Sequence, residues 1–183
     1  MSEYETFFQG KLVRLTALRP EDAAIMAAWS NNYEFLRMLD TDYVRPISAE
    51  EYAEKEKTRY DAISMEFRIR TLAEDKLIGF VGIHTIEWNN QAGHLSIGIG
   101  EPEYWNKGYG TDALRVALRY AFAELNLYRV GLDVIAYNER AIRAYEKVGF
   151  RREGAARQQV LRDGQRYDLV YMGILRDELI LED

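Results

Sequence analysis

The sequence contains no cysteine, only three prolines and only two histidines among its 183 residues. Without cysteine, the chain has no disulfide, no thiolate zinc ligand and no covalent cysteine nucleophile. The two histidines, His84 and His94, lie on different predicted strands and make a poor ligand set, so we predict no metal site. The chain has no apolar run of the ~20 residues that span a membrane, and acids stand near its start where a signal peptide carries bases. We therefore expect a soluble, cytoplasmic protein with no membrane partner.

An excess of basic charge is also missing. Lys and Arg number 24 against 30 Asp and Glu, which gives a net charge of −6. Because nucleic acids favour a basic protein face, we predict no nucleic-acid partner. An acidic surface is mildly suited to cationic substrates. The length predicts one domain over 1–183, with a core that buries roughly 70% of the surface of the unfolded chain.

Hydrophobic periodicity predicts a chain of alternating strands and helices. Runs that alternate apolar and polar residues indicate strands, and apolar residues every three or four positions indicate helices. The unit over 93–137 reads as strand, helix, strand, which requires a parallel crossover. The fold class is therefore α/β, with a mixed sheet (α+β) and helices on both faces. The predicted order is β-α-α-β-β-β-α-β-α-β-β, with strands near 11–18, 66–72, 77–88, 93–100, 128–137, 150–161 and 165–175 and helices near 19–32, 48–63, 111–127 and 138–148.

Capping residues support these boundaries. Asn31 and Asn32 indicate the end of the first helix, and Ser48 is a typical N-cap for the second. Asn138 is a typical N-cap, and Gly149 a typical stop, for the last helix.

The stretch "WNKGYGTDA" (105–113) carries two glycines just before a predicted helix. It matches the G-x-G-x-x-A dinucleotide pattern, but that pattern follows its strand directly and needs an acid about 20 residues on, and both conditions fail here. The nearby "GHLSIG" resembles a nucleophile elbow, yet it has one residue too many and no helix after it. Two interpretations stay open. One is a plain glycine turn, and the other is a helix N-terminus whose free amides bind a pyrophosphate.

Two blocks, "HLSIGIGEPEYWNKGYGTDAL" and "AYNERAIRAYEKVGFRREG", resemble the GNAT superfamily of acetyl-CoA-dependent N-acetyltransferases. The resemblance is closest to the RimJ/RimL group, which acetylates ribosomal-protein N-termini and has many relatives that act on small amines. It covers the chain from Lys11 to Leu175 and implies the GNAT acyl-CoA N-acyltransferase fold. One departure is Trp105, which stands where the superfamily often has Gln or Arg.

The resemblance implies how acetyl-CoA, the expected co-substrate, is bound. The backbone of β-strand residues near the loop would pair with the pantetheine arm, and the loop amides would hold the pyrophosphate. We expect glycines 98 and 100 to mark a bulge that opens a cleft, and the N–H of residue 99 or 100 to stabilise the oxyanion. Arg140 and Arg143 are further candidates for the 3′-phosphate. The cofactor-binding candidates are Ile97, Ile99, Gly100, Asn106, Lys107, Gly108, Tyr109, Gly110, Thr111, Asn138 and Lys147.

The resemblance also implies catalytic residues. Tyr145 is the expected acid that protonates the leaving thiolate, and it lies two turns from Asn138 along one helix face. Some family members place a glutamate base on the strand before the loop, and that position is His94 here. Histidine is a competent base near neutral pH. Glu87 is the next candidate and Glu101 another, each acting through water, whereas the competing interpretation of His94 is an ordinary strand residue.

The acceptor amine is expected to bind between the first two helices and the loop "LDTDYVRP" (39–46). Aromatic side chains would line that pocket, and acidic side chains would attract a cation. Each of these residues also has a plain core or surface interpretation. The candidates are Trp29, Tyr33, Phe35, Asp40 and Tyr43, with Asp42 and Tyr52 in addition.

The predicted function is acetyl transfer to a primary amine, such as a protein N-terminus or a polyamine, by direct transfer in a ternary complex. Dimers occur in this group of proteins, so the resemblance implies a homodimer. Two alternatives remain, a non-catalytic acetyl-CoA-binding module and an NAD(P)-dependent oxidoreductase.

Overall fold

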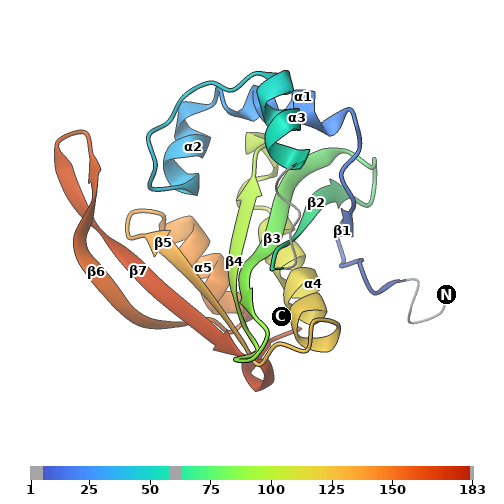
Figure 1. The fold of residues 1–183 in the computed structure, drawn as a ribbon, viewed down its shortest axis with the longest axis vertical. Coiled ribbons are helices and arrows are strands. Elements are labelled where there is room, and N and C mark those ends of the chain that lie inside the picture. Colours follow the sequence, from blue (N-terminus) through green and yellow to red (C-terminus); the bar gives the residue numbers. More distant parts are fainter. Residues whose placement is uncertain (1–5, 58–62, 182–183) are drawn as a thin grey trace.

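A computed structural model describes residues 6–57 and 63–181, and a seven-stranded sheet runs through them (Figure 1). The strand order is β1-β2-β3-β4-β5-β7-β6. β4 and β5 are parallel and the other neighbouring pairs are antiparallel, which confirms the mixed α/β sheet. The strands are β1 (Val13–Thr16), β2 (Met65–Thr71), β3 (Leu77–Glu87), β4 (Ala92–Ile99), β5 (Arg129–Ile135), β6 (Arg151–Arg162) and β7 (Gln165–Leu175), and the α-helices are α1 (Asp22–Trp29), α2 (Tyr33–Leu39), α3 (Ala49–Lys57), α4 (Tyr109–Ala123) and α5 (Glu139–Val148).

α2 is a helix that the sequence analysis did not predict. Asn31 and Asn32 were expected to end the first helix, but the Asn32 side chain accepts a hydrogen bond from the Phe35 amide at 3.1 Å and begins α2. A seven-residue helix is too short to show a clear period, so its cap was the only local signal. The next helix begins as predicted, with Ser48 Oγ accepting from the Glu51 amide at 3.1 Å. The remainder of the predicted 48–63 helix reaches residues 58–62, outside the described residues.

Helices cover both faces of the sheet, as predicted. α4 buries the apolar side chains that its period indicated, among them Leu114 and Leu118, against one face of the sheet. Met26 and Trp29 of α1, with Phe35 of α2, pack against the opposite face of β3. The sheet therefore has two distinct surfaces, called here the α4 face and the α2 face.

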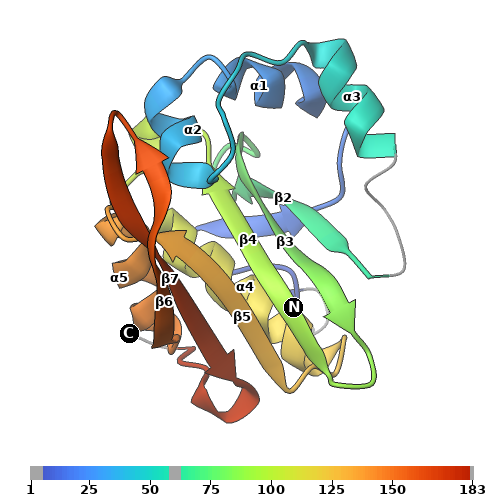
Figure 2. The same ribbon diagram turned by 60° about the vertical axis from the view of Figure 1, so that its left-hand side comes forward.

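The β6–β7 hairpin carries residues from the C-terminal region to α2 (Figure 2). Its turn contains Asp163 and Gly164, with φ of 49° and 75°. Two successive residues with positive φ match the right-handed twist of the flanking strands, as in a type I′ hairpin. The two adjacent strands predicted near 150–161 and 165–175 are therefore confirmed as a hairpin.

Asp112, in the first turn of α4, fastens the N-terminal segment to the helix. Its carboxylate accepts hydrogen bonds from the amides of Lys11, Leu12 and Val13 at 2.9, 2.8 and 3.0 Å. A Cβ on Gly10 would lie 2.3 Å from the same carboxylate, so only glycine fits there. These contacts join β1 to the start of α4 across about 100 positions of sequence.

None of the helices in the part of the chain that the structure describes is long and apolar enough to cross a membrane.

Candidate active site

β4 and β5 separate after a short paired segment and leave a cleft between them. They pair only from Ala92 to His94 on β4 and from Arg129 to Gly131 on β5. Figures 1 and 2 show the two strands close at one end and apart at the other. The cleft has a volume of about 440 Å³ and is lined by β4, β5, α2, the start of α4 and α5. It therefore opens a passage through the sheet, between the α4 face and the α2 face.

The free edge of β4 directs selected backbone groups into the cleft. The Gly100 amide donates to the Ile78 carbonyl of β3 at 2.9 Å. Because antiparallel pairing alternates along a strand, the N–H and C=O groups of Ile97 and Ile99 point the other way, toward the cleft. Of the two predicted oxyanion donors, Gly100 is thus committed to the sheet and Ile99 faces the open space.

The glycines of β4 allow close packing and do not mark the bulge that was predicted from the sequence. The β3–β4 register is regular from Gly79 to His84. A Cβ on Gly100 would lie 2.0 Å from the Trp29 ring, and one on Gly98 would lie 2.9 Å from Phe80. The cleft opens through the divergence of β4 and β5, and the glycines let α1 and β3 approach β4.

The predicted phosphate loop is a helix N-terminus with a glycine cap. Gly108 has φ of 88° and caps α4. The first four N–H groups of a helix have no partner within it, which here are those of Gly108, Tyr109, Gly110 and Thr111. Gly108, Gly110 and Thr111 line the cleft, as does Asn106. The Lys107 side chain is exposed, and the Tyr109 ring packs against Tyr104 at 4.9 Å between centroids, so neither side chain lines the cleft.

Trp105 shapes the cleft in a way that the sequence did not indicate. Its Nε1–H donates to the Ile99 carbonyl at 2.7 Å. The Arg140 guanidinium lies 4.0 Å from the centroid of the Trp105 ring, a cation–π contact between the loop and α5. Burial lowers the pKa of Arg140. Trp105 and Arg140 both line the cleft and connect its two sides.

Tyr145 lies on the α5 side of the cleft. It is buried, lines the cleft, and stacks edge-on against Phe150 with 5.7 Å between centroids. Burial, with a smaller contribution from the Asp133 charge, raises the pKa of its phenol above the usual value. The hydroxyl therefore keeps its proton through the neutral range and is able to donate it.

Among the other predicted residues of α5, one caps the helix and two line the cleft with exposed side chains. The Asn138 carbonyl oxygen accepts from the Ala141 amide at 3.2 Å, and its Nδ2 donates to the Met38 carbonyl of α2 at 3.0 Å. Asn138 therefore caps α5 and holds α2 in place. Arg143 and Lys147 line the cleft from exposed positions.

His94 faces the cleft and contacts a carboxylate that the sequence did not indicate. Its Nε2 lies 2.9 Å from Asp133 Oδ1 on β5, at the point where the strands begin to separate. Leu95 and Ile97 pack toward α4, so His94 and Ser96 project to the α2 face. Asp133 sits in mid-strand, and only the parallel pairing of β4 with β5 brings it to His94.

The structure does not place the other predicted bases at the cleft. Glu87 pairs with Ala92 at the far end of β3, roughly 23 Å along β4 from Ile99, and its carboxylate accepts from Asn90. Glu101 accepts from the Trp29 indole N–H at 2.8 Å.

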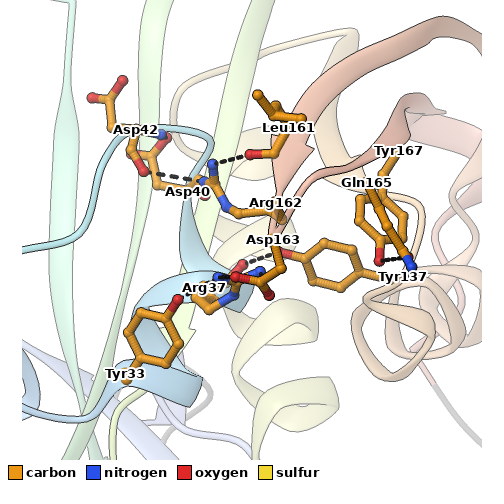
Figure 3. A network of polar contacts seen from close by, with 10 residues as sticks. All are labelled: Tyr33, Arg37, Asp40, Asp42, Tyr137, Leu161, Arg162, Asp163, Gln165 and Tyr167. Carbon is orange, nitrogen blue, oxygen red and sulfur yellow. Dashed lines mark hydrogen bonds and ion pairs between the residues drawn. The ribbon is translucent and has the colours of Figure 1, made fainter.

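The acceptor wall, defined here as residues 35–42, is clasped by the β6–β7 hairpin (Figure 3). Arg37 donates to both oxygens of Asp163 at 3.0 and 2.7 Å. Arg162 donates to the carbonyls of Asp40 and Asp42 at 3.0 and 3.1 Å. The Tyr137 hydroxyl donates to the Arg37 carbonyl at 2.5 Å. Two segments distant in sequence, the β6–β7 hairpin and the loop that holds Tyr137, thus fix this wall.

Only part of the predicted acceptor pocket lies at the cleft. Phe35 and Asp40 line it, whereas Tyr33 and Tyr43 are exposed at 56% and 85% and do not. Trp29 is buried in the core under α1, and Tyr52 packs at the edge of the same cluster. Aromatic composition alone did not distinguish core from pocket, because both use the same side chains. The lining residues of the wall that the prediction lacked are Met38, Leu39 and Thr41.

Comparison with known proteins agrees with this geometry. The family model described as "Acetyltransferase (GNAT) domain" matches residues 13–151. An SPbeta prophage-derived uncharacterized N-acetyltransferase, YokL of Bacillus subtilis (strain 168), is 28% identical over 96% of this chain and 97% of that protein. The spermidine N(1)-acetyltransferase of Escherichia coli (strain K12) is 38% identical over 84 residues, 46% of this chain and 45% of that protein.

A solved structure gives the same result. Spermidine N-acetyltransferase from Vibrio cholerae, in complex with CoA and spermine, matches with a TM-score of 0.81 and 26% identity over 91% of this chain and 96% of that chain. The chain therefore belongs to the GNAT acetyltransferase family and is an N-acetyltransferase with acetyl-CoA as co-substrate.

Proposed function

We propose that the protein transfers the acetyl group of acetyl-CoA directly to a primary amine of a small polycation such as a polyamine. The observation that carries this proposal is the passage between β4 and β5. It joins a helix N-terminus suited to phosphate on the α4 face to an acidic mouth, with Asp40 and Asp133, on the α2 face. Similarity to the spermidine acetyltransferases supports the acceptor class.

The residues present fit coenzyme A. The unpaired amides of Gly108 to Thr111 suit the pyrophosphate, since the helix dipole favours an anion there. The exposed edge of β4 at Ile97 suits the amides of a pantetheine arm, which would pair as an added strand. At Ile99 only the N–H is open, because the carbonyl accepts from Trp105. Arg143 and Lys147 are the candidates for the 3′-phosphate.

Two groups are placed to stabilise the transfer. The Ile99 N–H is the candidate donor to the oxyanion that forms when the amine attacks the thioester. Tyr145 is the candidate acid for the departing sulfur, because it lines the cleft and its phenol is protonated at neutral pH.

His94 is the candidate base. A primary amine with a pKa near 10 is neutral in only about one molecule in a thousand at pH 7, a deficit of about 4 kcal/mol. Asp133 orients the imidazole and stabilises the imidazolium after proton transfer. His94→Ala should therefore lose about 10²-fold in kcat/KM at pH 7, with a smaller loss at pH 9 where the free amine is abundant. Equal losses at both pH values would argue against a base role.

A second acceptor class is the N-terminus of a ribosomal protein, as the RimJ/RimL resemblance implies. A putative ribosomal N-acetyltransferase of Bacillus subtilis, YdaF, is 34% identical over 107 residues, 58% of this chain. A polyamine carries more positive charge than a protein N-terminus, so the carboxylates of Asp40 and Asp133 favour a polyamine.

Two measurements test the proposal. Calorimetry should show CoA binding, and thiol release should follow on spermidine, on N-terminal peptides and on amino acids. Fastest release with spermidine supports the polyamine acceptor, fastest release with peptides supports the alternative, and binding without release on any amine would contradict both. Light scattering on the same sample tests the predicted homodimer.

A further inference from the structure

A second histidine pair lies beside the first on the α2 face. His84 Nε2 is 2.8 Å from Ser96 Oγ, and Ser96 lines the cleft. His84 and His94 are direct register partners on β3 and β4, so both project from the same face. The acceptor side of the cleft thus carries a Ser–His pair next to the His94–Asp133 pair.

The fold makes specific room for His84. Gly82 is the register partner of Ser96, and a Cβ on Gly82 would lie 2.6 Å from His84 Nε2 and 2.8 Å from its Cε1. The imidazole therefore lies over Gly82 and reaches Ser96 only because no side chain stands there. The register of β3 shifts directly after His84, and Thr85 has φ of 46°, unusual for a β-branched residue. Bulges commonly re-aim a neighbouring side chain.

The chemistry of amide formation needs two deprotonations of the acceptor nitrogen. An ammonium loses one proton before attack, and the nitrogen loses a second once its bond to the carbonyl carbon has formed. The thiolate regains one proton when the C–S bond breaks, so one proton leaves to solvent in each turnover. His94 has a 44% exposed side chain and exchanges readily with solvent, which suits the first proton.

We propose that Ser96 and His84 take the second proton. Ser96 Oγ accepts the proton from the acetylated nitrogen while its own hydroxyl proton passes to His84 Nε2, and the imidazolium then releases a proton to solvent. Ser96 is the residue that touches the acceptor, and His84 is a positioning and proton-holding residue that acts through it. This inference rests on the proposed function, because it requires an amine acceptor.

The charged neighbours of His84 on this face are consistent with that role. Glu66 of β2 is the register partner of Gly82, is buried, and forms an ion pair with Arg68 at 2.5 Å. On the β4 side the neighbour is His94, whose Nε2 lies 2.9 Å from Asp133 Oδ1. Among the residues that the structure describes, the charges of Glu66 and Arg68 offset each other beside the imidazole.

Paired variants of Ser96 test the relay. Ser96→Ala should lower kcat by about 10²-fold, and Ser96→Thr, which keeps a hydroxyl, should restore most of it. The Ser96→Ala loss should persist from pH 7 to pH 9, since the second proton is removed after the amine has already lost its first. Wild-type kcat in Ser96→Ala, or a loss that disappears at pH 9 as for His94→Ala, overturns the relay.

Substitutions in β3 provide a second, independent test of the relay. His84→Gln should lose as much as Ser96→Ala, and the double variant should lose no more than either, because the pair acts as a unit. Gly82→Ala removes no titrating group but should displace the imidazole, with the same loss and unchanged CoA affinity. Losses that multiply in the double variant contradict the relay.

NMR separates the relay from the proposed function. The chain has only two histidines, so a His94→Gln sample assigns both imidazoles. Ser96→Ala should shift the His84 titration and leave that of His94 nearly unchanged, and an unshifted His84 titration overturns the pair. If the wild type turns over an amine and the Ser96, His84 and Gly82 variants do so equally well, the relay alone is refuted. If the wild type turns over no amine, the proposed function is refuted.

Discussion

The cofactor side and the acceptor side of the cleft are held by contacts of different range. The proposed cofactor side offers backbone groups of one stretch, from Ile97 to Thr111. The acceptor wall depends on hydrogen bonds between residues 100 to 126 positions apart, such as Arg37 with Asp163 and Asn138 with Met38. A short motif specifies the backbone conformation of the proposed cofactor side, and the separation of β4 from β5 exposes it. The acceptor wall, in contrast, forms only after distant segments have come together.

The difference predicts separate consequences for the two sides. A change at Tyr145 should reduce turnover. A change at Asp112 or Gly100, which hold α4 and β4 in place, should reduce the free energy of unfolding. A change to the Arg37–Asp163 ion pair should reduce acceptor binding alone.

The largest expected effect is that of Tyr145→Phe, which removes the proposed acid and leaves the ring in place. We expect kcat to fall about 10²- to 10³-fold with CoA affinity nearly unchanged. Stopped-flow thiol release and calorimetry measure the two quantities. Because the pKa of Tyr145 is raised, the wild-type rate should show no alkaline decline near pH 10 from loss of this proton. Unchanged turnover in Tyr145→Phe would remove the acid assignment.

Asp112→Ala should cost about 2–4 kcal/mol in the free energy of unfolding, because three amides lose their acceptor. Urea unfolding monitored by tryptophan fluorescence gives this value. Asp112→Asn keeps one acceptor oxygen and should cost clearly less. Equal stability of Asp112→Ala and the wild type would show that α4 does not need this connection to β1.

Gly100→Ala should destabilise the protein by about 1–3 kcal/mol, since the added Cβ would meet the Trp29 ring. Gly154→Ala is the matched control, because nothing lies within 4 Å of its added Cβ. The control should stay within about 0.5 kcal/mol of the wild type. If Gly100→Ala is as stable as this control, Gly100 is not needed for close packing against Trp29.

The smallest expected effect is that of breaking the ion pair between Arg37 and Asp163. Arg37→Gln should raise the acceptor KM about two- to fivefold and leave CoA affinity unchanged, with a smaller difference at high salt. Arg152→Gln breaks an exposed ion pair with Glu146 outside the cleft and serves as the control. Equal effects of the two variants on the acceptor KM would show that the Arg37–Asp163 ion pair does not contribute to acceptor binding.

Local signals predicted much of the fold and part of the residues that line the cleft. Asn138, Gly149 and the period of α4 were sufficient because caps and amphipathic faces are local properties. α2 was missed because seven residues carry too little periodicity. Glu87 was misplaced relative to the cleft because the sequence does not reveal which end of a strand faces it.

The sequence by itself determined the order of strands and helices, the glycine-capped N-terminus of α4 and the place of Tyr145, because each depends on residues within a few turns of one another. Only the tertiary structure decided that β4 separates from β5, that Asp133 meets His94, and that His84 reaches Ser96 across Gly82. These contacts depend on strand register and on the absence of a side chain at one position, which no local pattern encodes.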